Sequence, residues 1–225
     1  MERKQNISII GLGHVGLPMM TILSNLKKGG KYLYNVNAIE KNDKKGQNIQ
    51  KSINQNISAK TIDSLSKIDI DYTGVLYPGL MINGENINIL EYNCRFGDPE
   101  TQILMSKLQS DLLEICLAAA DKRLDQITIK WDERPTVGVI LASGGYPGKH
   151  EVNKDITGLD DVDDDINVFF AGVKNANGKL LTAGGRVMAV VGSGETLDEA
   201  REKTYKNVSK IKFDNMHYRT DIGLI

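Results

Sequence analysis

Residues 91–102, Glu-Tyr-Asn-Cys-Arg-Phe-Gly-Asp-Pro-Glu-Thr-Gln, join the end of a predicted strand to the start of a predicted helix. Upstream, two apolar runs at residues 75–82 and 86–94 flank an Asn83-Gly84 turn signal, which predicts a β-hairpin. Downstream, apolar residues recur at helical spacing from about Thr101 to Ala120. The order strand, loop and helix is therefore predicted around this segment.

The returning strand of the hairpin ends in two neighbouring oxygen donors. Because side chains alternate along a strand, Glu91 and Asn93 are expected to share a face with Ile87 and Ile89. A carboxylate beside an amide oxygen suits Mg²⁺, which takes few protein ligands and leaves positions for phosphate oxygens. A solvent-facing polar strand end produces the same pattern, so the spacing alone leaves both interpretations open.

The loop after this strand carries two further charged candidates. Asp98 followed by Pro99 is typical of a helix N-cap with proline at the first helical position. Alternatively, Asp98 contacts a substrate amine while Arg95 binds an anion through its guanidinium group, at a helix N-terminus that favours anions. The spacing does not separate a cap from a ligand, and Arg95 and Asp98 are the candidate catalytic residues.

Distinctive short motifs lie along the chain from residue 72 to near its end. They are Tyr-Thr-Gly-Val-Leu-Tyr (72–77), Gly-Leu-Met (79–81), the segment 91–102, Ser-Asp-Leu-Leu-Glu (110–114), Ala-Ser-Gly-Gly-Tyr-Pro-Gly (142–148), Gly-Gly-Arg-Val (184–187) and Tyr-Arg-Thr-Asp-Ile-Gly (218–223). Over about residues 70–225 the chain resembles glycinamide ribonucleotide synthetase, the ATP-grasp phosphoribosylamine–glycine ligase of purine biosynthesis. The resemblance implies ATP and Mg²⁺ as cofactors, with Glu91 and Asn93 as the metal ligands. It also implies that glycine is joined to phosphoribosylamine through an acyl phosphate.

The earlier portion of that family, including its adenine pocket, has no counterpart in this sequence. We therefore expect the last part of an ATP-grasp domain over residues 70–124 and a β-rich C-terminal domain over residues 125–225. Strands are predicted at 126–130, 137–143, 167–173 and 186–191, with a hairpin turn at Asn177-Gly178. A capping box at Thr196 and Glu199 opens a helix to about Ile211. Two glycine pairs, Gly144-Gly145 and Gly184-Gly185, allow either a ligand's close approach or bends in a sheet.

Residues 1–69 carry a different pattern. A short apolar run precedes Gly11-Leu12-Gly13-His14-Val15-Gly16, residues 17–26 have helical spacing, and a second apolar run ends at Glu40. This is the order of a dinucleotide site, in which Gly11, Gly13 and Gly16 approach a pyrophosphate and Glu40 accepts ribose hydroxyls. Residues 5–60 resemble the start of nucleotide-sugar dehydrogenases of the UDP-glucose and UDP-N-acetylmannosamine type, which implies NAD. A glycine turn that binds nothing is the alternative.

Charge and composition separate the two segments and exclude several classes of protein. Residues 1–70 hold 11 basic and 5 acidic residues, whereas residues 71–225 hold 17 basic and 24 acidic residues. The chain is 40% hydrophobic without a membrane-length apolar run, and its scattered lysines lack an aromatic platform for nucleic acid. With two cysteines, a reducing cytoplasm is expected, and Cys116 is predicted to be buried. The acidic run 160–165 is predicted to be a solvated loop.

These observations predict an α/β plus α+β chain. A truncated Rossmann-like βαβ segment at 1–69 precedes the last part of an ATP-grasp domain and a β-rich C-terminal domain. The predicted function is ATP-dependent carbon–nitrogen ligation of glycine to phosphoribosylamine, with no turnover expected from this chain alone. Partners are small-molecule substrates, not nucleic acid or membrane, and the oligomeric state is left open. The alternatives are an NAD-dependent nucleotide-sugar dehydrogenase fragment and a non-catalytic chimeric product.

Overall fold

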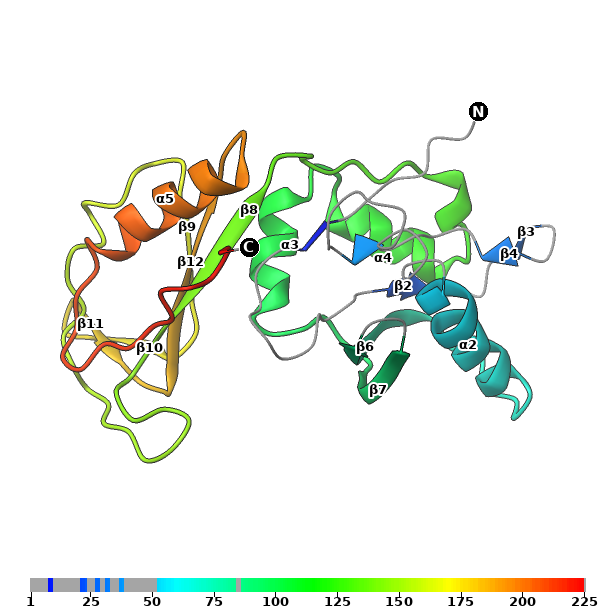
Figure 1. Cartoon of the computed structure of the whole chain (residues 1–225), viewed down its shortest axis with the longest axis horizontal. Helices are drawn as coiled ribbons and strands as arrows, with labels where there is room; N and C mark the ends of the chain where they lie inside the picture. The colour runs from blue at the N-terminus through cyan, green and yellow to red at the C-terminus, as the bar shows by residue number, and fades with distance from the viewer. Residues whose placement is uncertain are drawn as a thin grey trace. The chain divides into compact units, whose positions relative to one another are not determined.

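The structure is a computed structural model that describes residues 52–83 and 86–224, together with five short strands nearer the N-terminus (Figure 1). The chain divides into two compact units, with the main division between Glu133 and Arg134. Each unit mixes helices with mainly antiparallel strands. Of the helices in the described ranges, none is both long enough and apolar enough to cross a membrane.

The N-terminal strands are each two or three residues long: β1 Ser8–Ile9, β2 Thr21–Leu23, β3 Lys27–Lys28, β4 Lys31–Tyr32 and β5 Asn37–Ala38. β1 and β5 pair in parallel, β3 and β4 pair antiparallel, and β2 pairs antiparallel with residues 74–76. The helix predicted at 17–26 is therefore wrong at Thr21–Leu23. Its β-branched residues suit an extended backbone, and the neighbouring strand offers an edge for pairing. The predicted glycine turn at 11–16 and Glu40 lie outside the described residues.

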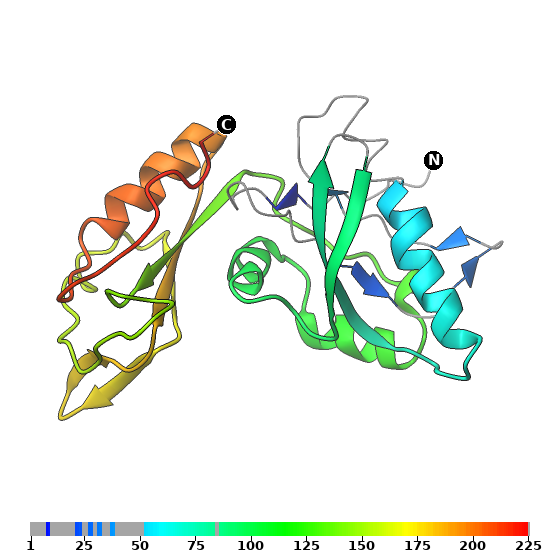
Figure 2. The same ribbon diagram turned by 60° about the horizontal axis from the view of Figure 1, so that its bottom comes forward.

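A long hairpin organises the first unit. β6 spans Gly74–Asn83 and β7 spans Asn86–Asn93, and they pair antiparallel as the sequence predicted. A π-helical turn, Ile53–Ser58, leads into α2, Ala59–Ser66, which lies beside the hairpin (Figure 2). Ile62 of α2 packs against Leu76 of β6, and the Thr61 and Tyr92 hydroxyls share a 2.7 Å hydrogen bond. These contacts hold α2 against both strands.

The helix predicted from Thr101 to Ala120 is two helices, α3 Glu100–Lys107 and α4 Leu112–Ala120. Leu108 is extended between them and forms a bridge with Trp131. Asp111 then caps α4, because its carboxylate accepts a 2.7 Å hydrogen bond from the Leu113 amide. A bridge and a cap therefore interrupt a run whose apolar spacing is helical throughout.

Two further predictions in this region are wrong. Cys116 is exposed rather than buried, because α4 turns Ile115, Ala118 and Ala119 toward the core instead. The strand predicted at 126–130 is replaced by a short 3₁₀ helix, η2 Leu124–Gln126, followed by irregular chain. Leu124 and Ile129 are buried there and pack in one cluster with Ile115, so the segment buries its apolar side chains without forming a strand.

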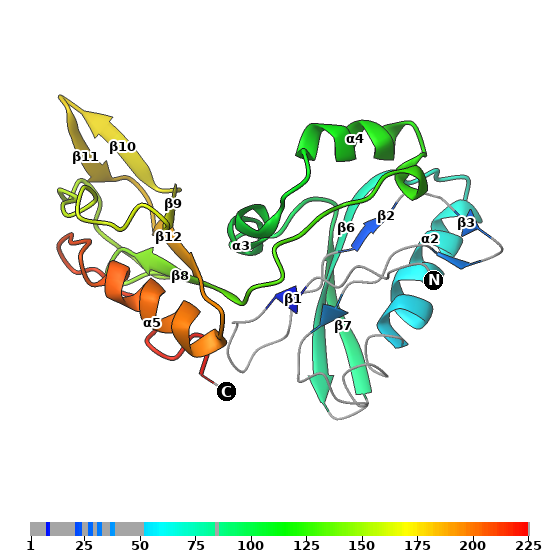
Figure 3. The ribbon, with the colours of Figure 1, turned by 90° about the horizontal axis from the view of Figure 1, so that it is seen from above.

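The second unit is a three-stranded antiparallel sheet covered by one helix. β8 Thr136–Ala142 and β9 Asn167–Phe170 flank β12 Arg186–Ser193, and α5 Leu197–Val208 lies along the sheet (Figure 3). The Thr204 hydroxyl lies 3.3 Å from the Val137 carbonyl oxygen and holds α5 on β8. The capping box at Thr196 and Glu199 is confirmed. α5 ends at Val208, short of the predicted Ile211.

A small hairpin completes this unit. β10 Val173–Ala176 and β11 Lys179–Thr182 pair antiparallel around the predicted turn at Asn177 and Gly178, whose φ angles are 53° and 81°. Both angles are positive, as a tight two-residue hairpin turn requires. The strand predicted at 167–173 instead stops at Phe170. A bend at residues 171–172 separates β9 from β10.

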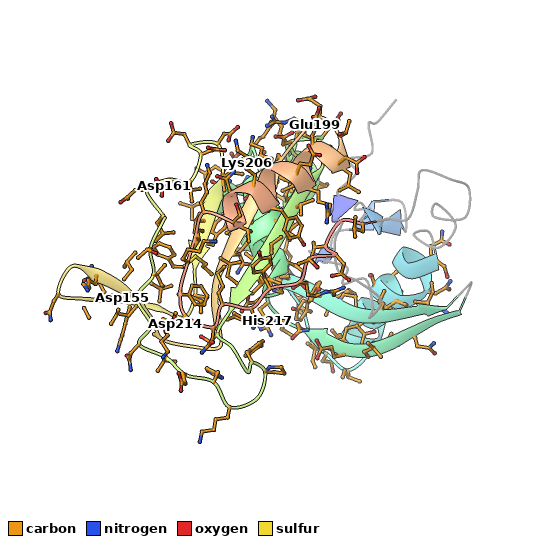
Figure 4. All side chains as sticks on the ribbon, turned by 60° about the vertical axis from the view of Figure 1, so that its left-hand side comes forward. Asp155, Asp161, Glu199, Lys206, Asp214 and His217 are labelled. Atoms are coloured by element: carbon orange, nitrogen blue, oxygen red, sulfur yellow. The ribbon has the colours of Figure 1, made fainter. Side chains whose placement is uncertain are left out.

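The acidic run at 160–165 does more than form a solvated loop. Asp163 accepts hydrogen bonds from Lys210 Nζ at 2.6 Å and Asn207 Nδ2 at 3.0 Å, and Asp165 pairs with Lys203. Figure 4 shows Asp161 on this loop and Lys206 on α5. The loop is therefore fastened to α5, and the sequence prediction missed these ion pairs.

Candidate functional site

The candidate metal ligands lie together at the end of β7. Asn93 Nδ2 donates a 2.9 Å hydrogen bond to Glu91 Oε1, so the two side chains lie on one face of the strand, as predicted. Glu91 is exposed and Asn93 is half-buried. The bond uses the amide nitrogen of Asn93 and leaves its carbonyl oxygen, the atom that binds cations, outside this contact.

A register shift corrects the rest of that predicted face. Glu91 pairs with Gly79 of β6, whereas Ile89 pairs with Leu80, so Leu90 is an extra residue in β7. The alternation of side chains moves by one residue at such a bulge, and Ile87 and Ile89 do not share the face of Glu91. A Cβ built at Gly79 would lie 3.0 Å from Glu91 Cγ, which places the glutamate over this glycine.

The loop between β7 and α3 presents the two candidate catalytic residues. Arg95 and Asp98 are both exposed. Arg95 Nη1 donates a 2.9 Å hydrogen bond to the Phe96 carbonyl oxygen, and Asp98 Oδ1 accepts one of 3.2 Å from Gln102 Nε2. Asp98 is not the N-cap of α3. Pro99 stands at that position and no side chain caps the helix, so the predicted capping role is wrong, and Asp98 instead contacts the Gln102 side chain of the first turn.

A buried pair beneath this loop was missed from the sequence. Tyr77 and Glu100 have 5% and 7% of their surfaces exposed, and the Glu100 carboxylate lies close enough to the Tyr77 hydroxyl to act on its pKa. Burial, followed by the Glu100 and Glu91 carboxylates, raises the pKa of the Tyr77 hydroxyl far above its usual value, while Arg95 opposes the shift. Charges from the strand, the loop and the helix therefore act on one hydroxyl.

The sequence holds no pattern that identifies this pair, although Gly97 marks its position in the structure. The backbone of Gly97 is not left-handed, yet a Cβ built there would lie 2.1 Å from Glu100 Oε2. A side chain at residue 97 would therefore meet the Glu100 carboxylate, which would have to move. A glycine three residues before a glutamate at a helix start is compatible with such a contact, but the spacing alone does not identify it.

The donor set at the end of β7 fits Mg²⁺. Glu91 and Asn93 offer two hard oxygen donors on one exposed face, and a Mg²⁺ ion bound to few protein groups keeps sites for phosphate oxygens. In the part of the chain that the structure describes, no group of three or more His, Cys, Asp or Glu side chains could hold a metal ion. The two residues thus suit a cation shared with a ligand rather than an all-protein metal cage.

The glycine pairs of the second unit make room for protein atoms. Cβ atoms built at Gly144 and Gly185 would lie 2.7 Å from the Asn215 carbonyl oxygen and 2.2 Å from the Tyr146 ring. An open depression of about 640 Å³ lies beside Gly144 and is lined by Lys149, His150 and His217, among others. The close contacts at these two glycines are made by the chain itself, so they do not indicate a ligand.

Two family models match this chain. Residues 35–101 match the phosphoribosylglycinamide synthetase ATP-grasp (A) domain, and residues 136–225 match the phosphoribosylglycinamide synthetase C domain. Glu91, Asn93, Arg95 and Asp98 all fall inside the first match. That match begins at residue 35, within the predicted N-terminal segment. The predicted domain limits at residues 69 and 124 stay predictions.

Curated relatives are similar over most of the chain. A phosphoribosylamine–glycine ligase from Vibrio vulnificus is 42% identical over 177 residues, which is 78% of this chain and 41% of the relative. One from Clostridium acetobutylicum is 40% identical over 186 residues, which is 83% of this chain and 44% of the relative. The chain spans less than half the length of these relatives.

Solved structures show the same fold. A phosphoribosylamine–glycine ligase from Thermotoga maritima aligns with a TM-score of 0.69 and 30% identity over 91% of this chain and 55% of that one. N5-carboxyaminoimidazole ribonucleotide synthetase from the same organism aligns with a TM-score of 0.50 at 14% identity, a likeness of fold alone. These comparisons do not support NAD binding or the dehydrogenase alternative at residues 5–60.

Proposed function

Because residues 35–101 and 136–225 of this chain belong to the phosphoribosylglycinamide synthetase family, we propose that it supplies the carboxy-terminal part of a phosphoribosylamine–glycine ligase. The proposed substrates are ATP, glycine and phosphoribosylamine. In the first step, a carboxylate oxygen of glycine would displace ADP from the terminal phosphorus. In the second, the amine nitrogen of phosphoribosylamine would displace phosphate from the acyl carbon and lose a proton.

The observation that carries this proposal is the cluster of polar groups at the end of β7. Glu91 and Asn93 share a 2.9 Å hydrogen bond, and Arg95 and Asp98 follow them on one short loop. All four lie inside the matched ATP-grasp region. Phosphoryl transfer depends on positioning and on neutralising charge, and this cluster offers both cation ligands and a cationic side chain.

Each residue has a distinct proposed role. Glu91 and Asn93 would hold Mg²⁺, which when bound offsets the negative charge of phosphate oxygens. Arg95 would bind an anionic group of a substrate or intermediate through its planar guanidinium. Asp98 would accept a hydrogen bond from a substrate amine. Arg95 and Asp98 are exposed, so a substrate can reach both without a change in the fold.

A hybrid enzyme tests the proposal. The 177 matched residues of this chain would replace their counterpart in the Vibrio vulnificus ligase, so that every other part of the enzyme is present. We expect sustained ADP release that requires both glycine and phosphoribosylamine, because the second step must clear the acyl phosphate before the next turnover. Glu91→Gln and Asn93→Ala should each lower the rate by at least about 100-fold, because each removes an oxygen donor from the charge-neutralising site.

Glu114→Gln is the matched control, because Glu114 is an exposed carboxylate on α4 outside the cluster. Its hybrid should retain the parent rate. A folded hybrid without substrate-dependent ADP release would refute the proposed function. A full rate in the Glu91→Gln or Asn93→Ala hybrid would remove the metal assignment and leave the ligase proposal standing.

A further inference from the structure

Glu100 is a buried acid to which the proposed reaction gives no role. It lies in the first turn of α3 with 7% of its surface exposed, and its carboxylate lies beside the Tyr77 side chain of β6, since both border the Cβ position of Gly97. A carboxylate loses much hydration on burial, and it persists there only where partners replace the water. Tyr77 is itself 5% exposed and packs with Leu104 and Phe96, so this partner is firmly held.

The carboxylate lies in a notch that only glycine leaves open. A Cβ at Gly97 would lie 2.1 Å from Glu100 Oε2 and 3.0 Å from Tyr77 Cε1. Both distances are shorter than ordinary van der Waals contact, and the first is far inside it. Any side chain at residue 97 would therefore displace the carboxylate or the loop.

The notch lies in the middle of the candidate site. Gly97 stands between Arg95 and Asp98, and Tyr77 pairs across the hairpin with Asn93. The Thr101 amide also donates a 3.0 Å hydrogen bond to the Gly97 carbonyl oxygen. From the first turn of α3, one carboxylate thus lies against Tyr77 of the strand pair and Gly97 of the loop, although it is too buried to be a surface ligand itself.

We propose that Glu100 is a positioning residue that fixes the loop carrying Arg95 and Asp98 against the strand pair carrying Glu91 and Asn93. The catalytic importance of this loop position rests on the proposed function. The contact between Glu100 and the loop is seen in the structure whatever the function is. Arg95 and Asp98 are exposed side chains on a short loop, and without an anchor they would sample many positions. Displacements of about 1 Å can cost about 100-fold in rate when reacting groups must be aligned.

The first test measures loop motion in the 225-residue chain by nitrogen-15 relaxation. In the parent chain we expect backbone order parameters near 0.85 for residues 95–98, and values below about 0.6 in Glu100→Ala, the usual figures for rigid and flexible backbone. Gly97→Ala should loosen the same residues. Glu114→Ala is the control, because it also removes an acid from a first helical turn, and it should leave the loop rigid.

Two more conservative substitutions keep the test decisive if the Glu100→Ala variant does not fold. Tyr77→Phe removes only the hydroxyl and should loosen the loop. Glu100→Gln keeps an oxygen that can accept from Tyr77 and should leave the loop close to rigid. Unchanged order parameters at 95–98 in both Tyr77→Phe and Gly97→Ala would overturn the proposal, whatever the enzyme does.

The second test uses the hybrid enzyme. Glu100→Ala should lower kcat by at least about tenfold with little change in the KM for ATP, because binding is kept while alignment is lost. Glu100→Gln should restore most of the rate. If the loop loosens while the parent hybrid has no turnover, the proposed function fails and the positioning contact stands. If the loop loosens and kcat is unchanged, the positioning role is wrong.

Discussion

At the scale of single residues, the hydrogen bond between Asn93 and Glu91 aligns two oxygen donors on β7. Two protein donors without a bound nucleotide should hold Mg²⁺ weakly, with a Kd on the order of millimolar, since Mg²⁺ gives up its water reluctantly. We expect calorimetry of the chain to show such binding, and Glu91→Gln to abolish it. Glu114→Gln should bind as the parent does. Equal Mg²⁺ affinity in Glu91→Gln would contradict the site.

Asp163 gives a prediction about pH. Hydrogen bonds from Lys210 and Asn207 lower the pKa of its carboxyl from the usual 3.8 to about 2, and Lys206 and Lys210 favour the charged form further. A depressed pKa in the folded state means that the charged form stabilises folding above about pH 4, and that this stabilisation is lost as the pH falls toward 2.

Urea unfolding measured from pH 7 to pH 2 checks this. The parent chain should exceed Asp163→Asn in stability by a constant margin above about pH 5, and the margin should shrink between pH 4 and pH 2. Lys210→Met, which removes a partner of the carboxylate, should lose most of the same pH dependence. A margin that does not change with pH would show that the ion pairs do not form in solution.

Some residues of the site could be read from the sequence and others could not. Period-two alternation correctly placed Glu91 beside Asn93, because the interval between them contains no irregularity. The same rule failed for Ile89, since a bulge at Leu90 leaves no clear mark in composition. Tyr77 and Glu100 were missed because their contact joins residues 23 positions apart through the notch at Gly97. Such contacts depend on register and packing rather than on local pattern.

At the scale of single elements, α4 gives the sharpest contrast with its sequence. Apolar residues occupy nearly every position of Leu112–Ala120, so the pattern could not show which face is buried. In the structure Leu113 and Leu117 are 66% and 51% exposed, and Cys116 is exposed with them. The spacing found the helix but not its orientation, because a uniformly apolar helix has no polar face to mark its outer side.

A thiol reagent tests this orientation. We expect Cys116 of the native chain to react with a disulfide reagent at a rate close to that of the unfolded chain, because the helix turns it toward solvent. Cys94 is exposed as well and reacts in parallel, so the measurement uses Cys94→Ser. Strong protection of Cys116 in this variant would mean that α4 buries the opposite face.

At the scale of the whole chain, the sequence motifs alone predicted the resemblance to a ligase. The family models support it over residues 35–101 and 136–225. The predicted domain limits stay predictions, and contacts are made across the first of them. Ile62 packs on Leu76, and Thr61 bonds Tyr92, across the predicted limit at residues 69 and 70. A change in charge along the sequence does not report such packing.

Limited proteolysis distinguishes the two divisions. We expect a resistant fragment that begins before Ala59, because α2 would lose its packing on the hairpin if it were cut away. The N-terminus of the fragment can be read by mass spectrometry. A fragment that begins near residue 70 would instead support the division predicted from the sequence.

We propose above all that this chain contributes to forming an amide between glycine and phosphoribosylamine. The most direct test of this proposal supplies the hybrid enzyme with carbon-14 glycine, ATP and phosphoribosylamine, and measures labelled glycinamide ribonucleotide together with ADP. We predict one labelled product for each ADP, with no labelled product and no sustained ADP release when phosphoribosylamine is omitted. ADP release without labelled product would contradict the account, because it would show a site that uses ATP but does not join the two substrates.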